Sequence, residues 1–103
     1  MRMNFIVTTL FVAAISLANG SSAHEQMQHI RSATFKLTYA GTTVLIDPLL
    51  AKKGAYPGFE GTLRSELRNP TVELPMPVEE VVSGVDAVVV THVHLDHWDG
   101  VAQ

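Results

Sequence analysis

Three of the five histidines of this chain and one aspartate lie between residues 92 and 97. Neutral imidazole and carboxylate are donors that zinc and similar borderline metals accept, and the chain has no cysteine to supply a thiolate. The candidate ligands are His92, His94, Asp96 and His97. Four donors so close in sequence are hard to gather around one ion at about 2.0 to 2.2 Å. Two metals about 3.5 to 4 Å apart relieve that crowding, so the run predicts half of a two-metal site.

Strand alternation explains the spacing of these residues. In an extended segment that leaves a strand, His92, His94 and Asp96 point one way, while the apolar residues between them point back towards the core. His97 then needs a turn to join the others. Two ligand pairs result, His92 with His94 and Asp96 with His97. The plain alternative is a solvated loop that traps metal nonspecifically, but the aspartate in register and the apolar strand before the run favour a built site.

The elements that must position this run begin with a predicted hairpin. Residues 33–39 alternate apolar and polar side chains, which is typical of a half-buried strand. Residues 40–42 predict a turn and residues 43–47 a second strand, which Pro48 ends because proline has no amide hydrogen to donate. The preceding residues 24–31 are interpreted as a polar lead-in segment.

A second group of elements leads into the histidine run. Residues 49–77 are rich in proline and glycine and predict a long loop. Residues 78–83 predict one short helical turn with Glu79 and Glu80 near its start. Residues 87–90 form a continuous apolar run, typical of a strand covered on both faces, and the candidate ligands follow at its carboxyl end.

Residues 1–23 have the organisation of a cleavable secretory signal. A short positive start is followed by an apolar run over residues 5–17 and by small residues before His24. The run is short for a membrane span, which needs about 20 apolar residues. We therefore expect a secreted or periplasmic protein with no membrane attachment after cleavage.

The charge of the chain excludes one class of partner. Its net charge is −3 and its seven basic residues are scattered, whereas phosphate binding needs clustered lysine and arginine. We expect a small-molecule substrate and no nucleic acid, and the sequence leaves the oligomeric state open.

The run Thr91-His92-Val93-His94-Leu95-Asp96-His97 resembles the signature of the metallo-beta-lactamase superfamily of hydrolases. The alternating strand, the turn, the segment 45–48 and the apolar strand precede it in the family's order. The resemblance covers roughly residues 30 to 103 and implies an α/β fold, a four-layer αββα sandwich. Residues 32–103 would be the N-terminal part of that domain, about its first half. The loop 53–59 and the stretch 68–75 look like the branch related to ascorbate-6-phosphate lactonase.

The resemblance also implies a mechanism. His92 and His94 would hold one metal and Asp96 and His97 the other, with the remaining ligands expected beyond Gln103. A metal-activated hydroxide, oriented by Asp96 as the catalytic residue, would attack an ester, lactone, phosphoester or amide. Two Zn²⁺ ions are the first choice, and Mn²⁺ or Fe are compatible with such a site. The alternative function is a catalytically inactive, truncated metal-binding fragment whose strand 87–90 exposes apolar surface.

Four further residues are candidates around the site. The resemblance suggests that Asp47 orients a ligand histidine through a hydrogen bond, although it could instead cap the turn before Pro48. Tyr56 and Phe59 on the long loop could line a substrate pocket or cover the small core. Trp98 could pack against the sheet or line the pocket, and packing is the favoured role.

Overall fold

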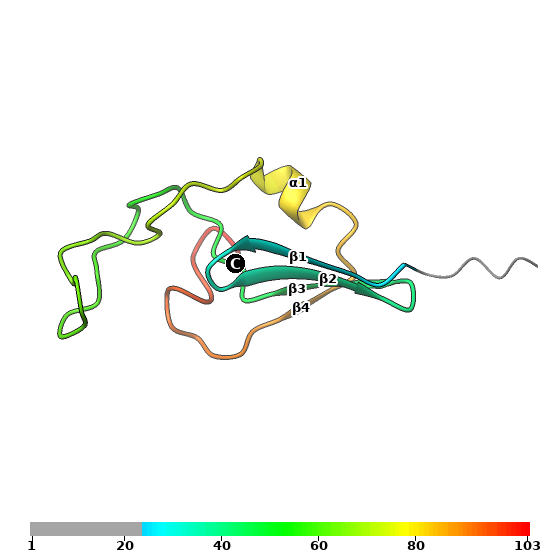
Figure 1. Ribbon diagram of the computed structural model, residues 1–103, viewed down its shortest axis with the longest axis horizontal. Helices are drawn as coiled ribbons and strands as arrows, with labels where there is room; N and C mark the ends of the chain where they lie inside the picture. The colour runs from blue at the N-terminus through cyan, green and yellow to red at the C-terminus, as the bar shows by residue number, and fades with distance from the viewer. Residues whose placement is uncertain (1–23) are drawn as a thin grey trace, which may run out of the picture.

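The computed structural model describes residues 24–103. The predicted signal sequence, residues 1–23, lies outside the described residues. The described chain forms one mixed sheet of four strands in the order β1-β2-β3-β4, with one short helix over a face of it (Figure 1). No helix in this part of the chain is both long enough and apolar enough to cross a membrane.

The sheet joins three antiparallel strands to one parallel strand. Its members are β1 (Gln26–Arg31), β2 (Thr34–Tyr39), β3 (Thr42–Ile46) and β4 (Ala87–Val89). β1, β2 and β3 pair antiparallel in sequence order, and β4 then pairs parallel to β3. The strands predicted at residues 33–39, 43–47 and 87–90 are confirmed. The parallel pairing of β4 brings the start of the histidine run to the end of β3, about 40 residues earlier in the chain.

The prediction of a lead-in segment over residues 24–31 needs correction, because most of it is strand β1. Met27 pairs with Leu37 of β2, and a register shift follows between His29 and Arg31. The first four residues of β1 are exposed, and only Ile30 and Arg31 are buried. An exposed edge strand need not alternate apolar and polar residues, so its sequence carried no strand signal.

The turn between β2 and β3 is a two-residue loop, Ala40 and Gly41. Both residues have positive φ angles, 48° and 79°. Such a pair is typical of the tight hairpin turns whose twist matches that of the strands they join. The hairpin predicted here is therefore confirmed.

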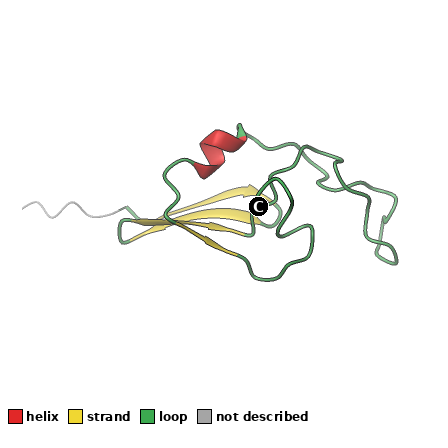
Figure 2. Ribbon diagram, turned by 180° about the vertical axis from the view of Figure 1, so that it is seen from behind, coloured by secondary structure: helices red, strands yellow, loops and turns green. Residues whose placement is uncertain are grey.

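Helix α1 (Val78–Val82) supplies the apolar cover for one face of the sheet (Figure 2). It begins after Pro77, and Glu79 and Glu80 lie in its first turn, as predicted. Its buried residue Val81 packs in a core cluster that is completed by the residues Ile30, Leu45 and Leu50. This small core joins β1, β3, α1 and the segment that follows β3.

The core is small enough that one truncation should be measurable. We expect Leu45→Ala to lower the free energy of unfolding by about 2 to 5 kcal/mol, because Leu45 is almost fully buried and its removal leaves a cavity. Urea denaturation followed by circular dichroism would measure the loss. Leu63→Ala is the matched control, since Leu63 is 94% exposed and should change stability by no more than about 0.5 kcal/mol. Equal effects of the two substitutions would contradict this core.

Strand β4 differs from its expected environment. Its sequence indicated a strand covered on both faces, yet all three of its residues are exposed in the described chain, with Val88 and Val89 each at 49%. β4 is the edge of the sheet and pairs with β3 alone. A continuous apolar run shows that water is unfavourable around a strand, but it does not show which element covers it.

Candidate metal centre

A turn after β4 brings the end of the histidine run back towards its beginning. The carbonyl oxygen of His94 accepts hydrogen bonds from the amides of His97 and Trp98, at 2.9 and 3.0 Å. The turn that the sequence required before His97 is therefore present. It lies beside the end of β3, because the amide of Asp47 donates to the carbonyl of Val89 at 2.9 Å.

The turn gathers three of the four predicted ligands. Donor atoms of His92, Asp96 and His97 all lie within 4.8 Å of one another. The ring centroids of His92 and His97 are 3.9 Å apart, and Nε2 of His97 lies 3.7 Å from Oδ2 of Asp96. His94 does not belong to this group, although its ring stands edge-on to that of His92 at 4.8 Å. The division into a His92–His94 pair and an Asp96–His97 pair stays a prediction.

The donor types suit a borderline divalent metal, and the distances between the donor atoms are slightly longer than such an ion requires. Two imidazoles and one carboxylate are the ligand kinds that catalytic zinc uses, with one position left for water or substrate. Ligands at about 2.1 Å from a tetrahedral ion lie roughly 3.4 Å apart. The group, at up to 4.8 Å, needs to close by up to about 1.4 Å to reach that spacing, and the exposed side chain of His92 has room for that rotation.

Asp47 holds His97 in a defined tautomer. Its Oδ2 lies 2.8 Å from Nδ1 of His97, and its carboxylate also accepts the amide and the hydroxyl of Thr91, each at 2.7 Å. An ionised carboxylate has no hydrogen to donate, so in the neutral ring Nδ1 of His97 carries the proton and Nε2 keeps its lone pair. The sequence analysis expected Asp47 to make such a hydrogen bond to a candidate ligand. Its effect on a bound metal stays a prediction.

Thr91 extends the same arrangement to His92. The single hydroxyl hydrogen of Thr91 is donated to Asp47, so the hydroxyl oxygen can only accept from Nδ1 of His92, 3.1 Å away. Nε2 of His92 is then also left with a free lone pair. Asp47 and Thr91 together leave Nε2 of both His92 and His97 available to bind a metal.

The surroundings of Asp47 also set a pH dependence. Burial alone would raise the pKa of its carboxyl, but the hydrogen bonds from the Thr91 amide, from His97 and from the Thr91 hydroxyl outweigh burial and hold that pKa below its ordinary value. Because the folded-state pKa is lowered, Asp47 stabilises the fold fully above the ordinary value of about 3.9, and this contribution is lost as the pH falls through the lowered pKa.

We therefore expect the stability difference between the unaltered protein and Asp47→Asn to shrink as the pH falls below about 4. Urea midpoints of both proteins between about pH 5 and pH 2.5 would measure it. A difference that grows as the pH falls below about 4 would contradict the lowered pKa of Asp47.

The buried carboxylate of Asp99 fixes the other side of the site. Oδ2 of Asp99 accepts the amides of Leu50 and Ala51 at 3.1 and 2.8 Å, and Oδ1 accepts that of Ala102 at 3.0 Å. Asp99 thus joins the chain after the candidate ligands to the segment after β3. The contact with Leu50 and Ala51 spans 48 to 49 residues, and no local sequence signal reports such a distance.

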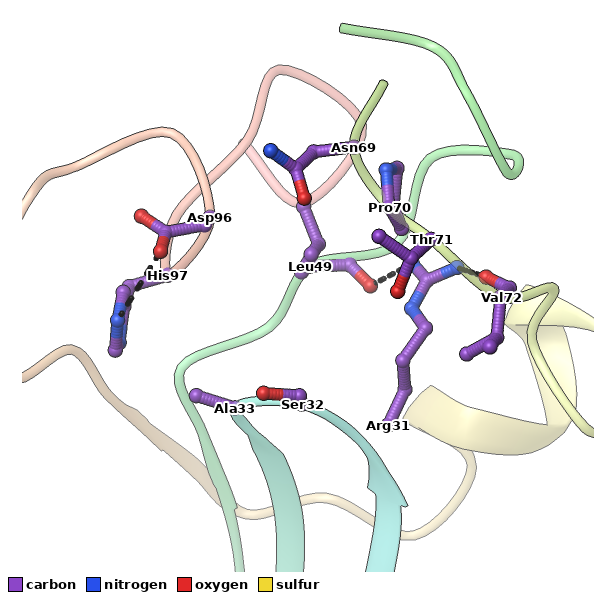
Figure 3. Close-up of a pocket in the computed structure, with 10 residues that line it drawn as sticks. All are labelled: Arg31, Ser32, Ala33, Leu49, Asn69, Pro70, Thr71, Val72, Asp96 and His97. Carbon is purple, nitrogen blue, oxygen red and sulfur yellow. Dashed lines mark hydrogen bonds and ion pairs between the residues drawn. The ribbon is translucent and has the colours of Figure 1, made fainter. Parts of the chain in front are cut away.

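A cavity of about 130 Å³ opens beside Asp96 and His97 (Figure 3). Its other walls come from the end of β1, the segment after β3 and the long loop: Arg31, Ser32, Ala33, Leu49, Asn69, Pro70, Thr71 and Val72. The residues 69–72 reach it because the backbone of Asn69 pairs with that of Tyr56. The long loop therefore contributes to the site through residues that the sequence analysis did not single out.

The three aromatic residues predicted as pocket candidates lie elsewhere. Phe59 lines a second, more open hollow of about 250 Å³, which shares Asn69 and Thr71 with the first. Tyr56 and Trp98 are partly buried and line neither of these two hollows. Burial raises the pKa of the Tyr56 hydroxyl, and the nearby Asp99 carboxylate raises it further. The backbone of Tyr56 pairs with that of Asn69 and so supports the loop. The packing role favoured for Trp98 stays a prediction.

The chain was compared with known proteins. Residues 42–103 match the family model described as "Beta-lactamase superfamily domain". Over 74 residues the chain is 53% identical to the "UPF0173 protein YddR" of Bacillus subtilis (strain 168). This match covers 72% of the present chain and 29% of that protein.

Two solved structures are also similar. One is "a possible metal-dependent hydrolase from Veillonella parvula DSM 2008", with 58% identity, a TM-score of 0.73 and coverage of 75% of this chain and 29% of that one. The other is "isothiocyanate hydrolase from Delia radicum gut bacteria", with 55% identity, a TM-score of 0.70 and coverage of 74% and 29%. The chain therefore spans about 29% of the length of these relatives.

Proposed function

The chain belongs to the beta-lactamase superfamily, and from this membership we propose that it carries the first metal ligands of a metal-dependent hydrolase. The observation that supports the proposal most directly is the group His92, Asp96 and His97, whose donor atoms lie within 4.8 Å of one another. A relative 58% identical to the chain is named as a possible metal-dependent hydrolase. Zn²⁺ is the first choice, two ions per complete site, with Mn²⁺ or Fe as alternatives.

The residues of the chain have separate tasks in this proposal. His92, His94, Asp96 and His97 would hold the metals, which supply a lowered pKa for bound water and an electrophile for the substrate's oxygen. Asp96, at the mouth of the cavity, orients the attacking water. Asp47 and Thr91 fix the tautomers of the neutral imidazoles, so that Nε2 of each ring is the ligand nitrogen.

The proposed substrate is a small molecule with an electrophilic carbon or phosphorus. Esters, lactones, phosphoesters and amides are all open to attack by an activated water. One relative is named an isothiocyanate hydrolase, so isothiocyanates, which water would attack at the central carbon, are a further candidate substrate class. The cavity beside Asp96 is too small for a polymer, and the net charge of −3 argues against nucleic acid.

Removal of the metal tests the proposal. The protein, treated with a chelator and dialysed, would be assayed against a lactone, a phosphoester, an ester, an amide and an isothiocyanate. We expect hydrolysis of at least one compound to disappear with the chelator and to return with Zn²⁺ or Mn²⁺. Hydrolysis that persists at full rate after verified metal removal would contradict the proposal.

The second candidate is an inactive metal-binding fragment, which the exposed valines of β4 favour. It predicts weak zinc binding, association through β4 and no turnover of any compound in the panel. Analytical ultracentrifugation with metal analysis separates the two candidates: a monomer that binds zinc tightly and hydrolyses a substrate excludes the fragment hypothesis.

We also propose that residues 1–23 direct export to the periplasm or the exterior. The supporting pattern is the short positive start, the apolar run and the small residues before His24. Intact-mass measurement of protein from the exported fraction would show His24 as the first residue, and a retained Met1 would contradict cleavage.

A further inference from the structure

Arg31 is a buried cation whose bonded partners are all neutral. Its side chain is only 3% exposed. Nη1 donates to the carbonyl of Val72 at 3.1 Å, and Nη2 donates to the carbonyls of Leu49 and Ala51. Within residues 24–103 it forms no ion pair, although Asp99 and Glu73 lie close enough to influence it. A guanidinium that keeps its charge inside a protein without an anionic partner is an unusual arrangement.

One donor of this guanidinium is left without any partner. Nε of Arg31 is the one buried side-chain polar atom without a hydrogen bond in the described chain. A buried donor of a charged group that stays unpaired is costly, so such atoms call for a ligand or a function. Burial also lowers the pKa of Arg31, against the opposing influence of Asp99 and Glu73. The charge is thus only partly balanced by the protein itself.

Arg31 lines the same cavity as Asp96 and His97. Figure 3 shows Arg31 rising from the end of β1 on one side of this space, with Asp96 and His97 on the other side. The cavity holds about 130 Å³. For comparison, a cavity of about 150 Å³ accommodates benzene. Nε itself has less than 1 Å² of accessible surface, so a group of a few heavy atoms in this space would reach its N–H after a small shift of the guanidinium and would then lie beside the candidate metal ligands.

We propose that this cavity is a subsite for a small carboxylate-type anion, held by the Nε–H of Arg31. Such an anion would satisfy the free donor and balance the guanidinium charge, which a neutral acceptor or a water molecule would not do. Calling the anion part of a substrate rests on the proposed hydrolase function, but binding of the anion itself does not. Arg31 is then a specificity residue: it selects substrates that carry an acidic group beside the scissile bond.

NMR can observe the free donor itself. We would titrate ¹⁵N-labelled, chelator-treated protein with sodium acetate and follow the Nε–H signals of the arginines, assigned by through-bond experiments. The Arg31 signal should shift progressively and saturate. Acetamide at the same concentration, and sodium chloride at the same ionic strength, should leave it in place. Arg68 is the internal control, because its Nε already donates to the carbonyl of Gly54 at 2.7 Å and should not respond.

A variant that fills the cavity keeps the test independent of the fold around Arg31. Ala33→Val adds two methyl groups to the cavity wall and keeps the arginine itself, and it should abolish most of the acetate response. No shift with acetate, an equal shift with acetamide, or an unchanged response in Ala33→Val would each overturn the proposal. The titration contains neither metal nor substrate. An acetate response in a protein without hydrolase activity would support the subsite and reject the proposed function. Hydrolase activity without an acetate response would support the proposed function and reject the subsite.

Discussion

Asp96→Asn is expected to lower the affinity of the protein for zinc by more than about 100-fold, because loss of a supporting outer residue alone typically costs about 10- to 100-fold. Asp96 lies in the group with His92 and His97, and its side chain is 39% exposed. Nε2 of His97 lies 3.7 Å from its carboxylate, beyond hydrogen-bond distance, so we expect the fold not to depend on this carboxylate. Competition with a chromogenic chelator would measure the affinity. The melting temperature of the metal-free protein should not change.

Glu66→Gln is the control for Asp96→Asn. It removes one carboxylate from an exposed position on the long loop and should leave zinc affinity unaltered. If a hydrolysed substrate has been identified, Asp96→Asn should also abolish most of the turnover, since the ligand and the group that orients the water are the same residue. An Asp96→Asn protein with normal affinity and normal turnover would refute both roles.

The sequence predicted the local arrangement of the site better than its long-range connections. The turn before His97 and the contact of Asp47 with a candidate ligand histidine follow from residues that are adjacent or belong to a known signature. The partners of Arg31 and the distant partners of Asp99 could not be found in this way. Each of these two side chains contacts backbone atoms 18 to 49 residues away, and a hydrogen bond to a backbone carbonyl or amide places no demand on the type of the partner residue.

The fold shows the same division. The hairpin β2–β3 and helix α1 were predictable, since alternation, a glycine turn and acidic residues after a proline are local signals. β1 was missed because an exposed edge strand has no need of alternation. The apolar run of β4 predicted cover on both faces, whereas its residues are exposed within the described part of the chain; composition reports only that a strand avoids water and not which element covers it. Local pattern therefore fixes an element's type, while its neighbours depend on parts of the chain that are distant in sequence.

Asp47→Asn is expected to weaken zinc binding about 10- to 100-fold and to lower the free energy of unfolding by about 1 to 3 kcal/mol. Asp47 has a φ angle of 46°, and asparagine tolerates this left-handed conformation, so the substitution adds no backbone strain. An asparagine amide that faces Nδ1 of His97 would donate to it. The ring proton would then move to Nε2, which could no longer bind a metal.

Long-range ¹H–¹⁵N spectra of the metal-free protein would report this exchange of tautomers directly. His97 should show a proton on Nδ1 in the unaltered protein and on Nε2 in Asp47→Asn. Asp86→Asn is the matched control: Asp86 also accepts a backbone amide, that of Thr43 at 2.8 Å, but it lies outside the ligand group. It should leave the His97 tautomer and the zinc affinity unchanged. If Asp47→Asn weakened zinc binding with the tautomer intact, the carboxylate would act through its charge, and orientation of the ring would not be its role.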